Sequence, residues 1–201
     1  MTLEPLTPEE VEELLTGSGA LVRGHFELSS GLHSPAYVQC ALLLQHPERA
    51  RRVARALARL LASLRPQGVV APALGALVIG HEVAEALGVP FRFTERKDGV
   101  MTLRRGFRFD PGERLVAVED VVTTGRSTLE AIEVVERAGG RVLAVGSIVD
   151  RTGDRNPFGV PFFDLLDLDL PAWRADACPL CRDGRPVDRP GSRPVRAAGT
   201  A

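Results

Sequence analysis

Lysine and asparagine are almost missing from this 201-residue chain, in which Lys97 and Asn156 are each the only residue of their kind. Arginine carries the positive charge instead, a bias that is typical of a GC-rich genome and says little about growth temperature. Lysine and arginine together number 25 against 26 acidic residues, so the net charge is −1. A chain without a basic excess lacks the electrostatic footprint of a nucleic-acid-binding protein.

Other absences narrow the class further. The three cysteines are an odd number, which argues against a disulfide framework. No apolar run reaches the roughly 18 residues that a transmembrane helix needs. Residues 1–13 are acidic and amphipathic, whereas a secretory signal would be basic and then apolar. We therefore expect a cytoplasmic protein that binds neither membrane nor nucleic acid.

The pattern of apolar residues predicts one α/β domain, with an apolar content of 44% that supports a substantial core. Strands alternate with helices over residues 50–150, which predicts a doubly wound sheet. Helices are expected over residues 7–22, 47–65, 76–87 and 127–137, short strands within 26–44, and buried strands at 68–71, 91–93, 115–118 and 142–149. From residue 175 onward the chain is rich in Pro, Arg, Asp and Gly, which predicts a loop-like tail with partial disorder at 196–201.

The most informative stretch runs from Leu115 to Thr128. Its first four residues are continuously apolar, which suits a strand covered on both faces of a parallel sheet. Glu119 and Asp120 follow at the carboxyl end, where open α/β sheets place their ligands, and can accept hydrogen bonds from two ribose hydroxyls. The turn over 121–127 offers hydroxyls, backbone N–H groups and a helix N-terminus to a phosphate. The alternative is an ordinary βα turn with Ser/Thr helix caps.

Val118 to Gly125 resembles the phosphoribosyl-pyrophosphate motif of the type I phosphoribosyltransferases. It lacks the Gly-Lys-Ser/Thr ending of a Walker A loop and the three spaced glycines of a dinucleotide fingerprint. The resemblance implies that phosphoribosyl pyrophosphate is bound by Glu119, Asp120, Val121, Val122, Thr123, Thr124, Gly125, Arg126 and Ser127, and by Ala73, Leu74 and Gly75 in the loop before the helix at 76. Many members of the family have a lysine at the position of Gly75. Backbone N–H groups there could still bind an anion, and the alternative is a tight βα turn.

Phe26 to Tyr37 reads as a strand, a Ser/Gly turn and a second strand, for which the simplest interpretation is a plain hairpin. Its Ser-Gly-x-x-Ser-Pro core before an aromatic residue resembles the N-terminal segment of the orotate phosphoribosyltransferases. In that family the segment lies over the base, and Tyr37 and Val38 match positions whose backbone contacts orotate. The family often has a lysine at the position of Ser29, so the chain departs from the pattern there as well.

Arg151 follows the last predicted buried strand, where an arginine can hold a carboxylate in a bidentate fork. The resemblance matches Arg151 to the orotate-binding arginine of the family and Thr123 to a second orotate contact. The alternative is a surface salt bridge between Arg151 and Asp150 or Asp154.

The charged segment Glu95–Gly99 resembles a shortened form of the family's mobile catalytic loop, which closes over the pyrophosphate of the neighbouring subunit. Its available cations are Arg96, Lys97, Arg104 and Arg105. The resemblance therefore implies a homodimer with a shared loop, in which Arg96 and Lys97 are catalytic together with Asp120. A solvated charged hairpin is the alternative.

Cys178 and Cys181 have the spacing of zinc ligands. A complete site needs four ligands, no second Cys pair exists, and Cys40 is remote in sequence. The four histidines show no metal-like spacing. We therefore expect no zinc site within one chain, and a site shared across a dimer is the less favoured alternative.

Together these features predict a type I phosphoribosyltransferase-like parallel sheet flanked by helices, with a small N-terminal hood. Residues 1–46 would form the N-terminal helix and hood, 47–170 the phosphoribosyl-pyrophosphate-binding core, and 171–201 a tail of unknown role. The resemblance implies transfer of the phosphoribosyl group to orotate, with Mg²⁺ bound mainly through substrate oxygens. A phosphoribosyltransferase for a purine or uracil, and a non-enzymatic sensor of phosphoribosyl pyrophosphate, are the alternatives.

Overall fold

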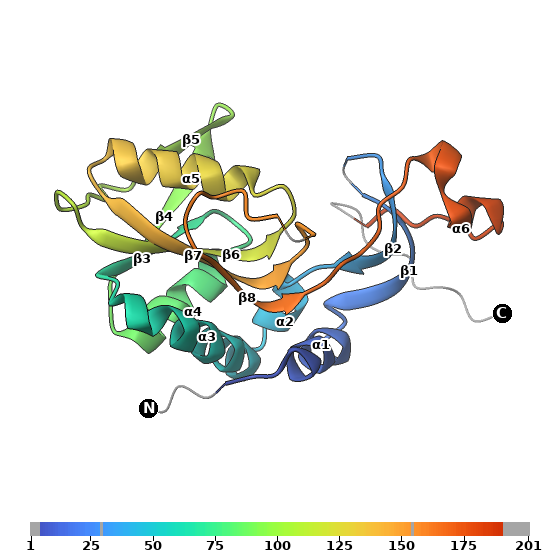
Figure 1. The fold of residues 1–201 in the computed structure, drawn as a ribbon, viewed down its shortest axis with the longest axis horizontal. Coiled ribbons are helices and arrows are strands. Elements are labelled where there is room, and N and C mark those ends of the chain that lie inside the picture. Colours follow the sequence, from blue (N-terminus) through green and yellow to red (C-terminus); the bar gives the residue numbers. More distant parts are fainter. Residues whose placement is uncertain (1–4, 29, 154, 191–201) are drawn as a thin grey trace.

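The computed structural model describes residues 5–28, 30–153 and 155–190, and its centre is a six-stranded sheet (Figure 1). The strands lie in the order β5-β4-β3-β6-β7-β8, and all neighbours are parallel except β4 and β5. Their bounds are β3 Gly68–Pro72, β4 Phe91–Lys97, β5 Val100–Leu103, β6 Arg114–Val122, β7 Arg141–Asp150 and β8 Phe162–Asp167. The predicted α/β sheet is confirmed, although β8 was not predicted.

The strand order reverses between the central strands β3 and β6. From β3 the chain continues to β4 and β5 on one side, and from β6 it continues to β7 and β8 on the other. Such a reversal opens a crevice at the carboxyl ends of the two central strands, where open α/β sheets bind their ligands. The fold therefore directs attention to the residues that follow β3 and to the end of β6.

Helices cover both faces of the sheet (Figure 1). α3 (Pro47–Leu61) and α4 (Leu77–Leu87) pack on one face, and α5 (Arg126–Arg137) lies on the other. α3 turns Val53, Leu57 and Leu61 fully into the core, as its 3.6-residue periodicity requires. It ends earlier than predicted, because residues Ala62–Leu64 form a 3₁₀ turn.

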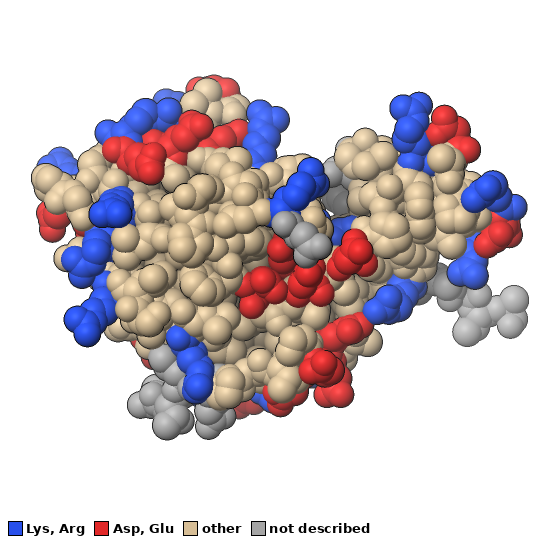
Figure 2. Space-filling view, in the orientation of Figure 1, with Lys and Arg blue, Asp and Glu red and all other residues tan. Residues whose placement is uncertain are grey.

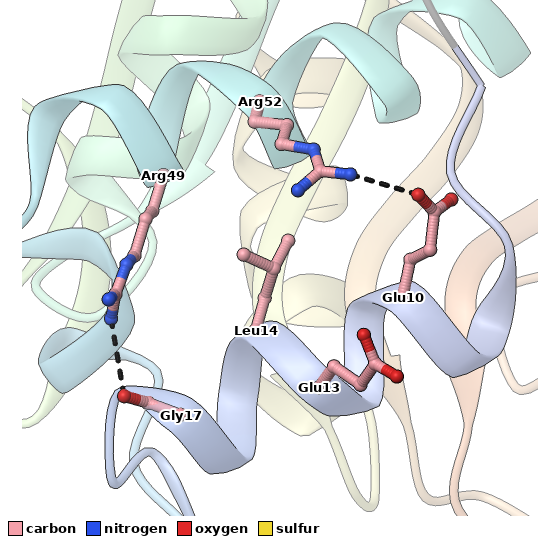
Figure 3. Close-up of a pocket in the computed structure, with 6 residues that line it drawn as sticks. All are labelled: Glu10, Glu13, Leu14, Gly17, Arg49 and Arg52. Carbon is pink, nitrogen blue, oxygen red and sulfur yellow. Dashed lines mark hydrogen bonds and ion pairs between the residues drawn. The ribbon is translucent and has the colours of Figure 1, made fainter.

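The first helix, α1 (Pro8–Gly17), starts at a capping box in which Thr7 and Glu10 bond reciprocally. Figure 3 shows α1 lying against α3, with an Arg52–Glu10 ion pair of 2.9 Å and Leu14 between the helices. The shallow hollow between them holds about 250 Å³ and is lined by these two helices rather than by strand ends. The prediction of a helix to residue 22 is wrong, because the chain from Leu21 enters a strand.

An antiparallel hairpin of β1 (Leu21–Glu27) and β2 (His33–Val38) projects from the sheet body (Figure 1). β2 runs on toward α2 (Ala41–Leu44), a short helix in a region where strands were predicted. Leu42, Leu43 and Leu44 made this region look extended, but only Leu43 and Leu44 are buried, which a helical turn allows.

The chain after β8 returns to this hairpin. Backbone bonds of 2.8 and 2.7 Å join Glu27 and His25 to Asp188, and a reciprocal pair of 2.7 and 2.9 Å joins His33 to Trp173. Between these contacts lie the 3₁₀ turn η2 (Ala175–Ala177) and the short helix α6 (Pro179–Arg182). The prediction of a loop-like tail from residue 175 is therefore wrong up to residue 190, and residues 196–201 lie outside the described chain.

We call the unit made of residues 21–38 and 173–189 the hood. It draws on two segments that the whole sheet body separates in sequence, so it is larger than an N-terminal hood alone. Figure 2 shows a group of acidic side chains beside the junction of the hood with the sheet body, and Lys and Arg side chains scattered among Asp and Glu elsewhere on that face. Within the described residues, no helix combines the length and apolar character needed to cross a membrane.

Candidate active site

The predicted pyrophosphate loop and the predicted ribose carboxylates meet at the reversal of the sheet. Ala73 follows β3 and donates its N–H to Thr94 O at 2.7 Å, and the next peptide bond, to Leu74, is cis. A Cβ atom built on Gly75 would lie 3.0 Å from Asp120 Oδ2 and 3.1 Å from Oδ1. The backbone of the loop therefore lies directly against the carboxylate at the end of β6.

Glu119 and Asp120 lie within β6, which continues to Val122 instead of ending before the acids. Glu119 is buried and accepts a hydrogen bond from Thr128 Oγ1 at 3.0 Å. Burial, reinforced by the charge of Asp120, raises the pKa of Glu119 to about 8, and burial also raises the pKa of Asp120. Two crowded carboxylates of this kind favour hydroxyl donors or a cation as partners.

The turn from Val121 to Gly125 connects these acids to α5. Gly125 adopts a φ of 72°, and a Cβ there would lie 2.8 Å from Phe158 Cε1, so this position requires glycine. The Arg126 N–H reaches Thr124 Oγ1 at 3.4 Å, and α5 begins at Arg126, one residue earlier than predicted. A hollow of about 80 Å³ is lined by Glu119, Val121, Val122, Thr123, Thr124, Gly125, Arg126, Ser127 and Thr128. All the predicted phosphate-binding positions of this turn thus surround one space.

A wider hollow of about 490 Å³ adjoins the same turn. Its lining residues are Thr123, Thr124, Thr152, Arg155, Asn156 and Pro157. Thr123 was predicted to contact the base, whereas Thr152, Arg155 and Asn156 were not singled out. Their positions follow from the course of the chain after β7, which no motif marks.

Arg151 follows β7 beside the end of β6, and its N–H donates to Val122 O at 2.8 Å. Its guanidinium is partly buried, which lowers the pKa of Arg151, and among the described residues its Nε has no hydrogen-bond partner. The Asp150 carboxylate is used locally, because it accepts bonds from Thr152 N at 2.7 Å and Thr152 Oγ1 at 3.2 Å. Asp154, the other predicted partner, lies outside the described residues. A partly buried guanidinium with an unmet donor is suited to an anionic ligand.

The charged segment Glu95–Gly99 lies in a two-stranded hairpin formed by the end of β4 and by β5, which is the alternative considered for it. Arg96 pairs with Glu130 of α5 at 2.6 Å and donates to Gly99 O at 3.0 Å. Lys97 is the exposed last residue of β4, opposite Val100. The structure therefore places Arg96 next to the helix that starts at the phosphate turn.

The end of β2, where the hood joins the sheet body, leads the chain to the carboxyl end of β6. Tyr37 and Val38 close β2, and the Tyr37 hydroxyl bonds Gln39 Oε1 at 3.1 Å. Two residues later, Cys40 Sγ lies 3.8 Å from Asp120 O, and burial raises the pKa of its thiol well above the ordinary value. Sequence reasoning missed Cys40, because no motif connects it with a residue 80 positions away.

The comparisons with known proteins agree with this geometry. Residues 41–159 match the model of the phosphoribosyl transferase domain, which defines the chain as a phosphoribosyl transferase. An orotate phosphoribosyltransferase of Heliobacterium modesticaldum is 48% identical over 94% of this chain and all of its own length. That of Thermotoga maritima is 49% identical over 92% of this chain and all of its own length.

A solved structure supports the same assignment. The orotate phosphoribosyltransferase of Aeropyrum pernix superimposes with a TM-score of 0.64 at 27% identity, and the match covers 79% of this chain and 93% of that one. This chain belongs to the orotate phosphoribosyltransferase family.

Proposed function

We propose that this protein transfers the phosphoribosyl group of 5-phosphoribosyl 1-pyrophosphate to orotate, which yields orotidine 5′-monophosphate and pyrophosphate in UMP biosynthesis. The observation that carries the proposal is the contact of the Gly75 backbone with Asp120 at the reversal of the sheet. That contact joins a loop suited to pyrophosphate to carboxylates suited to ribose. The family membership makes orotate the expected acceptor.

The ribose and its phosphates would occupy three neighbouring positions. Glu119 and Asp120 accept hydrogen bonds from the ribose hydroxyls, which would compensate the burial that raises their pKa values. The 5′-phosphate fits the hollow formed by residues 121–127 at the start of α5, where backbone N–H groups and hydroxyls converge. Leu74 and Gly75 would present backbone N–H groups to the pyrophosphate, whereas the N–H of Ala73, the third predicted position, is donated to Thr94 O.

Orotate would lie between Arg151 and the end of the hood. The unmet Nε of Arg151 supplies a charge-assisted donor for the orotate carboxylate. Thr123 adds a hydroxyl, and the backbone of Tyr37 and Val38 contacts the base. A uracil or purine lacks this carboxylate, so Arg151 is the residue that favours orotate over the other bases.

The residues present fit the Mg²⁺ that the family implies. Mg²⁺ prefers oxygen ligands and is usually bound through carboxylates, waters and substrate phosphates rather than by an all-protein cage. Buried carboxylates at the end of β6 meet that preference. When bound, the ion supplies charge neutralisation for the leaving pyrophosphate. The protein's own residues orient the ribose through Asp120, hold the phosphate in the turn, and exclude water beneath the hood.

Arg96 and Lys97 would act on the departing pyrophosphate from the neighbouring subunit of a cytoplasmic homodimer. Arg96 is within reach of solvent, with 39% of its side chain exposed in its pair with Glu130. A cation held this loosely can exchange its partner when an anionic substrate arrives, because exposed ion pairs contribute little stability. Cationic stabilisation of a leaving group acts on the rate of the chemical step.

The assay that tests the proposal measures pyrophosphate release with phosphoribosyl pyrophosphate and each of five bases: orotate, uracil, adenine, hypoxanthine and xanthine. We expect release with orotate to exceed that with the other four. Greater pyrophosphate release with uracil or a purine than with orotate would identify that base as the substrate instead. Binding of phosphoribosyl pyrophosphate without turnover of any base would instead support the sensor alternative.

A further inference from the structure

Four side chains with metal-binding atoms meet in the hood, away from the candidate active site. His25 lies on β1, His33 begins β2, Cys178 immediately precedes α6, and Cys181 lies within α6. Their ligand atoms all lie within 4.8 Å of one another. The expectation that the cysteine pair would lack ligands within its own chain is therefore wrong, because the hairpin supplies the two missing side chains from a distant part of the sequence.

Three sulfur–nitrogen distances within this cluster are close to those of a tetrahedral zinc site. Cys178 Sγ lies 3.5 Å from His25 Nε2, and Cys181 Sγ lies 3.7 Å from that atom and 3.3 Å from His33 Nδ1. Zinc bound tetrahedrally at its usual bond lengths would separate sulfur from nitrogen by about 3.6 Å. The two ring nitrogens are 2.8 Å apart, closer than the roughly 3.3 Å of such a site. Binding of an ion would part these two nitrogens by about half an ångström and bring the widest pair, now within 4.8 Å, to about 3.8 Å or less.

The ring nitrogen of His25 that faces away from the cluster, Nδ1, already has a hydrogen-bond partner. His25 Nδ1 lies 2.9 Å from the backbone oxygen of Arg185, which can only accept, so Nδ1 carries the proton. The lone pair of Nε2 then points into the cluster. Metal-binding histidines characteristically donate their other ring N–H to a backbone carbonyl or a carboxylate in this way.

The scarcity of buried residues in the C-terminal segment of the hood is a separate reason to expect a cross-link between that segment and the hairpin. His25 and His33 are 5% exposed and Cys178 is fully buried. Cys178 is also the only buried residue between positions 171 and 190, all of which the structure describes. A two-stranded hairpin with so little apolar packing is marginal by itself, and small units without a sufficient core are commonly held by a metal or by disulfides.

We propose that His25 Nε2, His33 Nδ1, Cys178 Sγ and Cys181 Sγ bind one structural Zn²⁺ ion that fastens the C-terminal segment of the hood to its hairpin. Two thiolates balance the charge of the ion, so the bound site is neutral. A mixed thiolate and imidazole set selects zinc over the harder cations. Four protein ligands leave no open position, which marks a structural site rather than a catalytic one.

The competing chemistry for two cysteines at this spacing is a disulfide between Cys178 and Cys181. Both are free thiols in the structure. The ring nitrogens of two histidines, which a disulfide would not need, lie against both sulfurs. This arrangement favours the metal over the redox pair.

The proposal also concerns the candidate active site, and this part rests on the proposed function. His33 begins the strand that ends with Tyr37 and Val38, the residues placed over the base. A zinc ion at His33 would therefore fix one end of the base-covering strand. Its loss should raise the KM for orotate more than it lowers kcat.

The direct test measures metal in the intact protein. The purified full chain is loaded with zinc, dialysed against a weak competing chelator and examined by elemental analysis. We expect about one zinc per chain. Cobalt substitution should then produce thiolate-to-cobalt charge transfer and the intense visible bands of a tetrahedral ion. Absence of zinc binding, or six-coordinate cobalt spectra without thiolate bands, would overturn the proposal.

Variants identify the ligands. Cys181→Ser at the exposed position and His25→Ala should each weaken zinc affinity more than about a hundredfold, since loss of outer-sphere partners alone costs about ten- to a hundredfold. Cys181→His keeps a ligand atom and should restore binding. His81→Gln and Cys40→Ser, which change the same residue types outside the cluster, should keep one zinc per chain. If the Cys181 and His25 variants bind zinc as the wild type does, the site is wrong.

Two measurements separate this proposal from the other inferences. Mass spectrometry of the non-reduced protein tests for a Cys178–Cys181 disulfide, and its dominance after purification under reducing conditions would overturn the metal site. Zinc stoichiometry and cobalt spectra need no substrate. A protein that binds zinc but does not turn over orotate would therefore refute the proposed function and leave the metal site intact.

Discussion

The backbone of Gly75 lies against the carboxylate of Asp120, so that a Cβ atom at position 75 would come within 3.0 Å of Asp120 Oδ2. Many relatives were expected to have a lysine at this position, and its absence here is a departure from their pattern. In this chain a Cβ at position 75 requires the Asp120 carboxylate to move by a few tenths of an ångström. Under the proposed function, the loop would bind the pyrophosphate through backbone N–H groups where a lysine would offer a charge.

The first prediction concerns this contact. Gly75→Ala should lower kcat/KM for phosphoribosyl pyrophosphate by about ten- to a hundredfold, because small displacements of a positioning group are costly to catalysis. Gly17→Ala is the matched control, since a Cβ there meets nothing within 4 Å. Steady-state kinetics of both variants make the comparison. Equal kinetics for Gly75→Ala and the control would show that the contact has no role.

The second prediction concerns Asp120. Asp120→Asn keeps the size of the side chain but removes the charge that accepts a ribose hydroxyl, so kcat/KM should fall at least about tenfold, as expected for a hydrogen bond to a charged group. Asp110→Asn changes an exposed acid outside the site and should behave as the wild type. An unchanged kcat/KM in Asp120→Asn would contradict the assigned role.

The third prediction is a pH dependence of stability. The pKa of Glu119 in the folded protein is about 8, above its ordinary value of 4.5, so the folded state binds this proton more tightly than the unfolded chain. The resulting stabilisation is complete below pH 4.5 and is lost as pH rises to about 8.

Denaturant unfolding of the wild type and Glu119→Gln measures this effect. The free energy of unfolding of the wild type should decline relative to the variant between pH 5 and pH 8, with a slope no steeper than about 1.4 kcal/mol per pH unit. Glu133→Gln, which removes a carboxylate that is 64% exposed, is the control and should run parallel to the wild type. Parallel curves for Glu119→Gln as well would refute the raised pKa.

The fourth prediction concerns base selection. Arg151→Ala should reduce kcat/KM for orotate about a hundredfold or more, because a charge-assisted bond contributes about 1.5–3 kcal/mol and a bidentate pair lies at or above the upper end. Arg151→Lys should recover little of this, since an ammonium cannot form the fork. The affinity for phosphoribosyl pyrophosphate should change little. An unchanged kcat/KM for orotate in Arg151→Ala would show that Arg151 does not select the base. Equal loss of affinity for orotate and for phosphoribosyl pyrophosphate would show the same.

The fifth prediction tests the shared loop. Arg96→Ala and Lys97→Ala should lower kcat more than they weaken orotate binding. Mixing Arg96→Ala chains with Asp120→Asn chains should restore activity in hybrid dimers, because one of the two sites then receives an intact loop and an intact Asp120. Hybrids that form, as shown by mass spectrometry of the intact complex, but stay inactive would place the loop and the site in one subunit.

The parts of the molecule that could be predicted from the sequence are those whose structure depends on residues close together in the chain. The buried strand into Glu119 and Asp120, the turn at Gly125 and the helix after it are one continuous string, so their geometry follows from local pattern. The resemblance to a family then added Arg151, Tyr37 and Val38. These assignments stay predictions until their variants are measured.

The parts that failed depend on contacts between distant residues. Cys178 meets His25 across 153 positions, and neither the spacing of the histidines nor that of the cysteines shows this. The return of the chain to the hairpin is made by backbone bonds at His25, Glu27 and His33, which carry no side-chain pattern. The helix α2 and the strand start at Leu21 were missed for the simpler reason that short apolar runs fit either helix or strand.

The two-segment construction of the hood has a consequence for biosynthesis. During translation the hairpin of β1 and β2 emerges early, but Trp173, Cys178 and Asp188, which complete it, emerge only after every strand of the sheet. A lone two-stranded ribbon is marginal in water. A nascent chain that ends at residue 170 would thus contain all six strands of the sheet but only the hairpin segment of the hood. Under the proposed function, the hood that covers the base would therefore be completed last, by the final residues synthesised.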